Sequence, residues 1–187
     1  MQPVVLHTER LTLSVPTGAD VDAIHAACQD AAIQRYTTVP APYERRHAEG
    51  FIPFAQSRWA EGVEATWAIR EGHTLAGMVG VHRIAEGGTG EIGYWMAPGS
   101  RARGLLTEAC RAVIDWGFSA SGPALARIEW RAVVGNIASA RVARTLGFRY
   151  EGVLRQALAN AFGRDDAWIA GLLTDDDRMP QPWPVLN

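Results

Sequence analysis

The sequence contains no lysine: all 18 of its basic residues are arginine, so it carries no side-chain amine. It has only two cysteines, Cys28 and Cys110, which do not indicate a disulfide framework. No apolar stretch approaches the roughly 20 residues needed to cross a bilayer, and residues 1–10 lack the pattern of a signal peptide. The formal net charge of −2 gives no reason to expect binding to nucleic acid or to a membrane. We therefore expect a soluble, cytoplasmic protein.

The composition is that of an ordinary globular domain. The chain has 187 residues, of which 48% are hydrophobic and 20% charged, values that suit one domain. We assign this domain to residues 1–178 and regard residues 179–187 as a Pro-rich tail. No cluster of His, Cys and Asp has the spacing of metal ligands, so no metal site is expected.

Hydrophobic periodicity predicts strands and helices in a mixed order along the chain. The expected strands cover residues 10–15, 66–70, 75–83, 90–96, 126–133, 148–152 and 167–174. One helix is expected after Thr17, which has the capping-box spacing to Asp20, and others over residues 44–61, 105–119 and 139–146. Pro53 predicts a kink or a break in the second helix. Residues 66–96, with a turn at Glu86-Gly87-Gly88, are typical of an antiparallel meander. We expect a mixed α/β protein whose sheet has helices on both faces.

A basic, glycine-containing loop precedes the helix that begins near Leu105. It reads Arg101-Ala102-Arg103-Gly104-Leu105-Leu106-Thr107. A helix N-terminus offers free amide N–H groups and a partial positive charge, and glycine allows an anion to come close to the backbone. Arg101 and Arg103 add guanidinium donors suited to phosphate oxygens. The loop alone is compatible with a phosphate site or with a simple turn that carries two solvated arginines.

Several ordered motifs around this loop resemble the GNAT superfamily of N-acetyltransferases. They are Glu91-Ile92-Gly93-Tyr94-Trp95-Met96 with the basic loop, then Asn136-Ile137-Ala138-Ser139, then Leu146-Gly147-Phe148. The beginning, Thr8-Glu9-Arg10-Leu11, and the segment Gly163-Arg164-Asp165-Asp166 are similar to the branch of ribosomal-protein-alanine N-acetyltransferases. The resemblance spans roughly residues 7–178. It implies a GNAT-like mixed, mostly antiparallel sheet of about six to seven strands.

The resemblance also implies an activity: transfer of the acetyl group of acetyl-CoA to a primary amine by direct attack in a ternary complex. The acceptor is either a protein N-terminus or a small molecule, and the protein is expected to be a monomer or a homodimer. In this family two parallel strands separate to admit the pantetheine arm. The backbone of Trp95, Met96 and Ala97 would bind that arm, and residues 101–107 would bind the pyrophosphate. The amide of Asn136 is expected to bind the arm as well.

The sequence departs from the family pattern at two positions. Leu106 stands where the loop usually has a small residue, and Ala143 stands where many members have the tyrosine that protonates the departing thiolate. These departures keep a catalytically silent acyl-CoA-binding module open as an alternative. An acyltransferase that uses a longer acyl-CoA is a second alternative.

The candidate catalytic residues are Glu91 and Ser139. Glu91 is the candidate general base, because it lies on the strand that meets the thioester and a carboxylate acting through water can deprotonate an amine. The alternatives are a solvated glutamate and a water chain to backbone carbonyls. Ser139 is the candidate donor to the thiolate, and equally a candidate N-cap of the following helix. His82 is a minor candidate for a second base.

The acceptor side is less clearly indicated. The loop of residues 36–43 is expected to line the acceptor pocket, with Tyr36, Thr37 and Tyr43 as its candidate residues. Trp59, Trp67 and Trp95 are further candidates for this pocket, and each is also a candidate for core packing.

Overall fold

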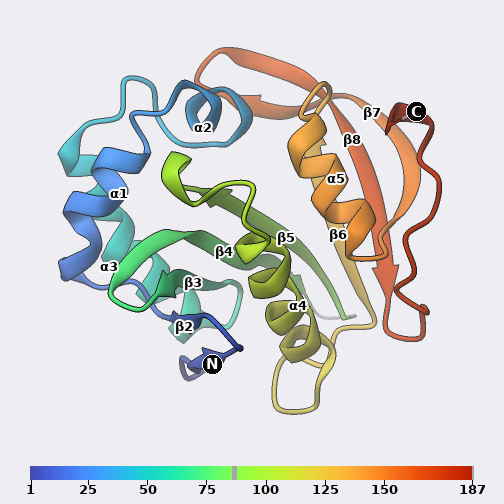
Figure 1. Ribbon diagram of the computed structural model, residues 1–187, viewed down its shortest axis with the longest axis horizontal. Coiled ribbons are helices and arrows are strands. Elements are labelled where there is room, and N and C mark those ends of the chain that lie inside the picture. Colours follow the sequence, from blue (N-terminus) through green and yellow to red (C-terminus); the bar gives the residue numbers. More distant parts are fainter. Residues whose placement is uncertain (86–87, 187) are drawn as a thin grey trace.

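One mixed sheet organises the residues that the computed structural model describes, 1–85 and 88–186 (Figure 1). Its eight strands lie in the order β1-β2-β3-β4-β5-β6-β8-β7. They are β1 (Leu6–His7), β2 (Thr12–Ser14), β3 (Ala65–Glu71), β4 (Thr74–Ala85), β5 (Thr89–Met96), β6 (Arg127–Val133), β7 (Arg149–Asn160) and β8 (Gly163–Leu173). All the neighbouring pairs are antiparallel except β5 with β6. The predicted fold class is confirmed, with more strands than expected, because the short β1 pairs with β2 at the edge of the sheet. Most of the predicted turn, at Glu86 and Gly87, lies outside the described residues.

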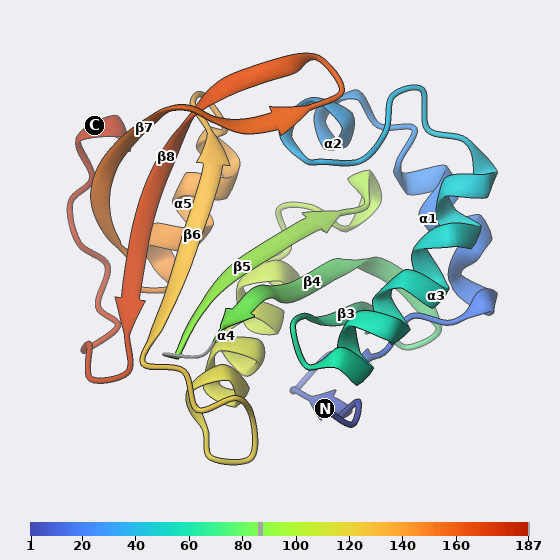
Figure 2. The same ribbon diagram turned by 180° about the vertical axis from the view of Figure 1, so that it is seen from behind.

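Helices cover both faces of this sheet. They are α1 (Val21–Ala27), α2 (Ala31–Tyr36), α3 (Arg45–Glu61), α4 (Leu105–Phe118) and α5 (Ile137–Thr145). Figures 1 and 2 show α4 and α5 on one face, and α1 with α3 on the other. The chain reaches α1 through the predicted capping box of Thr17 and Asp20. Asp30 caps α2, where its Oδ1 accepts hydrogen bonds from the amides of Ala32 and Ile33.

The α3 helix corrects one expectation. It continues without a break through Pro53, although proline removes one hydrogen bond from a helix. Ala48, Ile52, Ala55 and Trp59 all point inward and are buried. Tertiary packing of this face therefore keeps the helix intact.

Two apolar clusters hold the layers together. The larger one joins α4 and α5 to the sheet and contains three mutually packed indoles, of which Trp67 contacts both Trp59 and Trp116 edge-on with ring centroids 4.9 Å apart. The smaller cluster lies under α1 and α3 and includes Ile24, Ile52 and Met78. The two faces of β5 are therefore supported by different sets of residues.

The Pro-rich tail packs on the domain itself. Trp183 is fully buried and donates a hydrogen bond from its indole N–H to the Phe148 carbonyl at 3.0 Å. Its ring lies 5.4 Å from that of Trp130 and 5.6 Å from that of Tyr150. The tail thus completes the large cluster on the side of α5.

Candidate active site

The strands β5 and β6 begin side by side and then separate, as Figure 2 shows. Their parallel pairing starts at Thr89 with Arg127 and ends at Ile92 with Trp130. β5 nevertheless continues to Met96, while β6 continues along β8. The backbone of residues 93–96 therefore presents an edge that β6 does not cover. An extended ligand can add to such an edge as if it were another strand.

The N-terminus of α4 lies just beyond this opening. Gly104 is its N-cap with a φ of 77°, and no side chain caps the helix. This φ favours glycine, because other residues are strained in that region. The amides of Leu105, Leu106 and Thr107 have no acceptor within the helix, so they are donors available to an anion. The positive end of the helix dipole favours the same charge.

The two arginines of the loop are paired with carboxylates. Arg101 donates from Nη2 to Asp30 at 2.7 Å and from Nε to the Met96 carbonyl at 3.1 Å. Arg103 donates two hydrogen bonds to Glu71, both at 2.8 Å. The Arg101 guanidinium, with the helical amides of α2, outweighs desolvation and holds the pKa of Asp30 below its usual value. The guanidinium groups of Arg101 and Arg103 are therefore already paired, and the backbone amides of the loop are the donors that stay available to an anion.

Leu106 does not crowd this loop. Its side chain is half-buried and packs against the large apolar cluster, while Leu105 is fully buried in it. The departure from the family pattern is therefore accommodated by the core of the protein.

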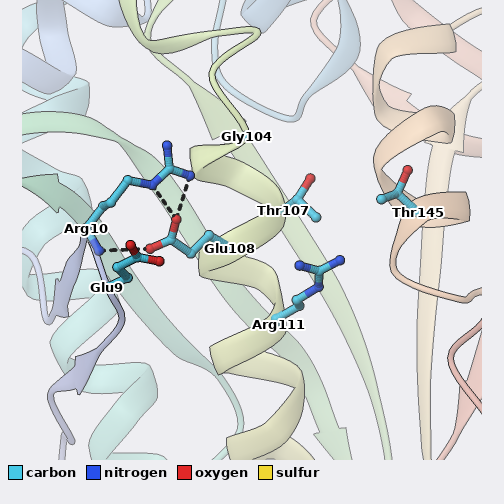
Figure 3. A pocket seen from close by; sticks show the side chains of 7 residues that line it. All are labelled: Glu9, Arg10, Gly104, Thr107, Glu108, Arg111 and Thr145. Atoms are coloured by element: carbon cyan, nitrogen blue, oxygen red, sulfur yellow. Dashed lines mark hydrogen bonds and ion pairs between the residues drawn. The ribbon is translucent and has the colours of Figure 1, made fainter.

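A hollow of about 480 Å³ lies beside the same helix end. Glu9, Arg10, Gly104, Thr107, Glu108, Arg111 and Thr145 line it. Figure 3 shows Thr107 and Arg111 on the side of α4 that faces Thr145 of α5, and Arg10 paired with Glu108. Hydroxyl, carboxylate and guanidinium groups therefore line a polar surface that extends from the end of α4, away from the opening between β5 and β6.

A cluster of hydroxyl groups lies where α5 meets the separated strands. The Oγ of Ser139 lies 3.1 Å from the hydroxyl of Tyr94. The indole N–H of Trp130 donates to both, at 3.0 Å to Ser139 and 3.1 Å to Tyr94. Burial raises the pKa of the Tyr94 phenol, so it stays protonated and able to donate. Ser139 is thus held within a small polar network inside the large apolar cluster.

This arrangement corrects two sequence-based expectations. The N-cap of α5 is Asn136, not Ser139: the Asn136 side-chain oxygen accepts from the Ser139 amide at 3.2 Å. That oxygen is therefore occupied by the helix, and the Asn136 NH₂ group is the part left for a ligand. A phenol is also present beside Ser139 although Ala143 replaces the usual tyrosine. Alternation along β5 places Tyr94 on the same face as Ile92 and Met96, and this signal could have revealed it.

The backbone of Ala97 is already engaged. Its amide donates to the Ala76 carbonyl and its carbonyl accepts from the Ser100 amide, both at 2.9 Å. Ala97 therefore serves the sheet and the following turn. Alternation along an antiparallel pair turns the backbone of Trp95, like that of Ala97, toward β4. Of the three residues expected to bind a pantetheine arm, Met96 is therefore the one whose amide lies on the uncovered edge.

The opposite face of β5 carries charge. Glu91 lies 3.2 Å from Arg83 and 3.6 Å from Arg131. Arg131 also pairs with Glu129 at 2.6 Å, and Arg127 joins Glu129 to Glu151. Burial raises the pKa of Glu129, but its two arginine partners outweigh that effect and leave the pKa below its usual value. Ion pairs therefore run across the sheet from β4 to β7.

The residues expected to line an acceptor pocket fall in two groups. Tyr36 and Thr37 are half-buried at the end of α2, which Arg35 fastens to Asp165 of β8 by two hydrogen bonds of 2.8 Å. Tyr43 instead is 6% exposed in the smaller apolar cluster. The structure places Tyr43 in the core, because the chain turns inward before α3. Figures 1 and 2 show α2 between the end of β5 and the β7–β8 hairpin.

Comparison with known proteins identifies the family. The family profile described as "Acetyltransferase (GNAT) domain" matches residues 10–149. N-acetyltransferase YoaA of Bacillus subtilis (strain 168), described as uncharacterized, is 33% identical over 155 residues, or 81% of this chain and 86% of that protein. Mycobacterium smegmatis RimJ in complex with CoA-disulfide has the same fold, with a TM-score of 0.85, 19% identity, and coverage of 97% of this chain and 93% of that one. The microcin self-immunity acetyltransferase MccE in complex with acetyl-CoA and AMP superposes with a TM-score of 0.80 and 21% identity, covering 89% and 93%.

The chain belongs to the GNAT acetyltransferases, as its motifs predicted. It is an N-acetyltransferase. Among residues 1–85 and 88–186, no group of three or more His, Cys, Asp or Glu side chains is arranged to hold a metal ion. No helix in that part of the chain is long and apolar enough to cross a membrane.

Proposed function

We propose that this N-acetyltransferase transfers the acetyl group of acetyl-CoA to a primary amine by direct attack within a ternary complex. One observation carries the proposal: the uncovered edge of β5 leads directly to the uncapped N-terminus of α4. An extended arm on the strand and an anion at the helix end are the two things that this geometry holds. Acetyl-CoA contains both, in the same order.

The cofactor-binding residues follow from that placement. The pantetheine arm lies along the uncovered edge of β5, where the Met96 amide faces the thioester oxygen, while Trp95 holds this part of β5 against β4. The amides of residues 104–107 bind the pyrophosphate, while Arg101 and Arg103 contribute positive charge. The hollow beside α4, with Arg111, receives the nucleotide end.

The hydroxyl cluster serves the departing thiolate. Ser139 is the donor to the sulfur: its hydroxyl, which donates to the Tyr94 oxygen at 3.1 Å, turns toward the thiolate as it forms, while the Tyr94 hydroxyl donates to the Ser139 carbonyl at 3.3 Å and holds this residue in place. A hydrogen bond to the thiolate stabilises the negative charge that develops as the C–S bond breaks. Ala143 leaves room on α5 for this arrangement.

The acceptor is a primary amine, supplied by a peptide N-terminus or a small molecule, and it enters from the face that carries Glu91. The ion pairs of Glu91 with Arg83 and Arg131 make this face polar, so a charged ammonium group can approach it without losing polar surroundings. Tyr36 and Thr37 border the entrance. The monomeric or homodimeric state and the cytoplasmic location stay predictions of the sequence.

A thiol-release assay with a panel of primary amines tests the function. We expect wild-type protein to release CoA from acetyl-CoA, and we expect Gly104→Ala to raise the KM for acetyl-CoA about 10-fold, because a Cβ strains the left-handed backbone that directs the amides. Gly99→Ala is the matched control, since a Cβ there meets nothing within 4 Å and should leave the KM unchanged.

The two alternatives predict different results in the same assay. If CoA raises the melting temperature and no amine releases thiol, the protein is a silent acyl-CoA-binding module. If a longer acyl-CoA has a higher kcat/KM than acetyl-CoA, the preferred acyl group is not acetyl.

A further inference from the structure

His82 lies directly over the point where β5 leaves β6. A Cβ built on Gly93 would meet its Nε2 at 2.9 Å and its Cδ2 at 3.0 Å, and one built on Gly80 would meet its Cε1 at 3.2 Å. The ring therefore covers two facing glycines, Gly80 and Gly93, which pair across β4 and β5. Gly93 is the first residue of β5 beyond the parallel ladder. The imidazole is thus fixed at the mouth of the opening, on the acceptor face.

The other ring nitrogen is turned toward a carboxylate. Nδ1 lies 3.4 Å from Oε2 of Glu64, and Arg58 also contacts Glu64, at 3.4 Å. The hydrogen bond with His82 and the charge of Arg58 lower the pKa of Glu64 despite partial burial. An ionised carboxylate only accepts hydrogen bonds, so the proton of a neutral imidazole resides on Nδ1 and the lone pair on Nε2.

We propose that His82, oriented by Glu64, is the general base that takes the proton from the acceptor amine. The inference rests on the proposed function and adds a residue to its acceptor side. Residues 95–96, which would hold the thioester, lie two to three positions beyond Gly93, or roughly 7–10 Å along the strand. An amine that contacts the acyl carbon, at about 3 Å and on the side toward Gly93, then lies roughly 4–7 Å from Nε2, and the shorter part of that range is within reach of a general base acting through one water molecule.

The proton balance is simple. An ammonium group gives one proton to Nε2, and the neutral nitrogen attacks the carbonyl carbon to form the C–N bond. The tetrahedral oxyanion collapses, and the electron pair of the broken C–S bond goes to sulfur. The amide nitrogen loses its second proton to water, the sulfur gains one from the Ser139 hydroxyl, which solvent reprotonates, and His82 returns its proton to solvent, so that one proton is released for each acetyl group transferred. Glu64 acts through His82 and is a positioning residue.

Other charged groups face the His82 ring, and a test must distinguish their effects on the pH dependence of kcat from the effect of His82. Glu91 is the cross-strand neighbour of His82 on β5, and it brings Arg83 and Arg131 with it. Glu64 and Arg58 approach from the other side. Each of the two acids can be neutralised without a change of shape by replacement with glutamine.

The test compares kcat against pH for wild type, His82→Gln and Glu91→Gln, with His73→Gln as the control on an exposed turn histidine. We expect the wild-type kcat to fall toward acidic pH, because a base that is already protonated cannot take a proton from the amine. The acid limb should lie at the same pH for two acceptors of different amine pKa. His82→Gln should lower kcat about 10²–10³-fold and abolish this acid limb, with little change in the KM for acetyl-CoA. His73→Gln should behave as wild type.

Glu64→Gln gives a second readout. It should lower kcat about 10-fold, and the double variant with His82→Gln should be no slower than His82→Gln alone, because the two groups act as a unit. A CoA-induced rise in melting temperature shows that each variant is folded.

Two results would overturn the proposal while leaving the acetyltransferase function standing: a His82→Gln variant with kcat within threefold of wild type, or an acid limb that disappears in Glu91→Gln but persists in His82→Gln. Absence of thiol release by the wild-type protein would instead overturn the proposed function itself. Should His82→Gln fail to fold, the Glu64→Gln variant and the wild-type pH profile still decide the matter.

Discussion

The two faces of β5 carry different kinds of side chain. On the face toward α4 and α5, Ile92, Tyr94 and Met96 join an apolar cluster that encloses a few hydroxyl groups. On the other face, Trp95 packs against the smaller apolar cluster, and Glu91 belongs to a series of ion pairs that crosses neighbouring strands. One strand thus separates an apolar environment with a few hydroxyl groups, proposed for the cofactor, from one that combines apolar packing with charge, proposed for the acceptor.

The difference teaches how one reaction divides between two surfaces. A thiolate needs a few fixed donors in a dry setting, where each hydrogen bond is strong. An amine that arrives as an ammonium ion needs a polar surface and a base. The first surface should therefore be sensitive to loss of packing, and the second to pH.

The largest expected effect is on the apolar face. Trp183→Ala removes a fully buried indole that packs on Trp130 and Tyr150, so the free energy of unfolding should fall by about 3–5 kcal/mol. Urea unfolding measures it. Trp95→Ala, on the half-buried opposite face, is the comparison and should cost less. Equal losses would mean that the two faces do not differ in packing.

The next effect concerns catalysis on the same face. Ser139→Ala should lower kcat about 10²-fold, and Tyr94→Phe about 10-fold, because the phenol acts only through Ser139. Stopped-flow measurement of thiol release should show the double variant to be no slower than Ser139→Ala. A fully additive double variant would contradict the positioning of Ser139 by Tyr94.

The smallest effect concerns the charged face. The pKa of Glu129 is lower in the folded protein, so its contribution to stability is present above the unfolded value, about 4.3, and is lost as the pH falls through the lower folded value. Glu129→Gln should therefore reduce the free energy of unfolding by about 1 kcal/mol at pH 7, a modest value because solvent screens the pairs. Once the pH has fallen below the folded pKa of Glu129, the variant and the wild type should converge. Denaturation curves at several pH values check this, and a constant difference down to pH 2 would argue against it.

The sequence predicted the local structure of the basic loop better than it predicted contacts between distant segments, for a physical reason. The loop of residues 101–107 is defined by local features, namely a glycine, a helix start and their spacing, and these are readable along the chain. The network of Ser139, Tyr94 and Trp130 depends on three elements that meet only in the folded protein. The same holds for Asp30 and Glu71, which pair with the loop arginines from far along the chain.

The errors have causes of the same kind. Ser139 was a plausible N-cap by residue type, but Asn136 precedes the helix and its side chain accepts the hydrogen bond of the Ser139 amide. Pro53 predicted a kink or a break, and the helix with its buried face continues without a break. Tyr43 was expected in a pocket because the corresponding segment lines the pocket in relatives, yet its ring packs into the smaller apolar cluster. In each case a tertiary contact decided between two locally acceptable states.

Arg101 connects the end of β5 to the helix that borders the proposed acceptor entrance. It connects the Met96 carbonyl, at the end of β5, to Asp30, which caps α2, and α2 is fastened to β8 through Arg35 and Asp165. A phosphate that draws Arg101 away from Asp30 changes the cap of the helix bordering the acceptor entrance. By thermodynamic linkage, whatever factor the bound cofactor applies to acceptor affinity, the bound acceptor must apply to cofactor affinity. In the proposed ternary complex, the affinities for the two substrates are then coupled through the Arg101 guanidinium group, whichever substrate binds first.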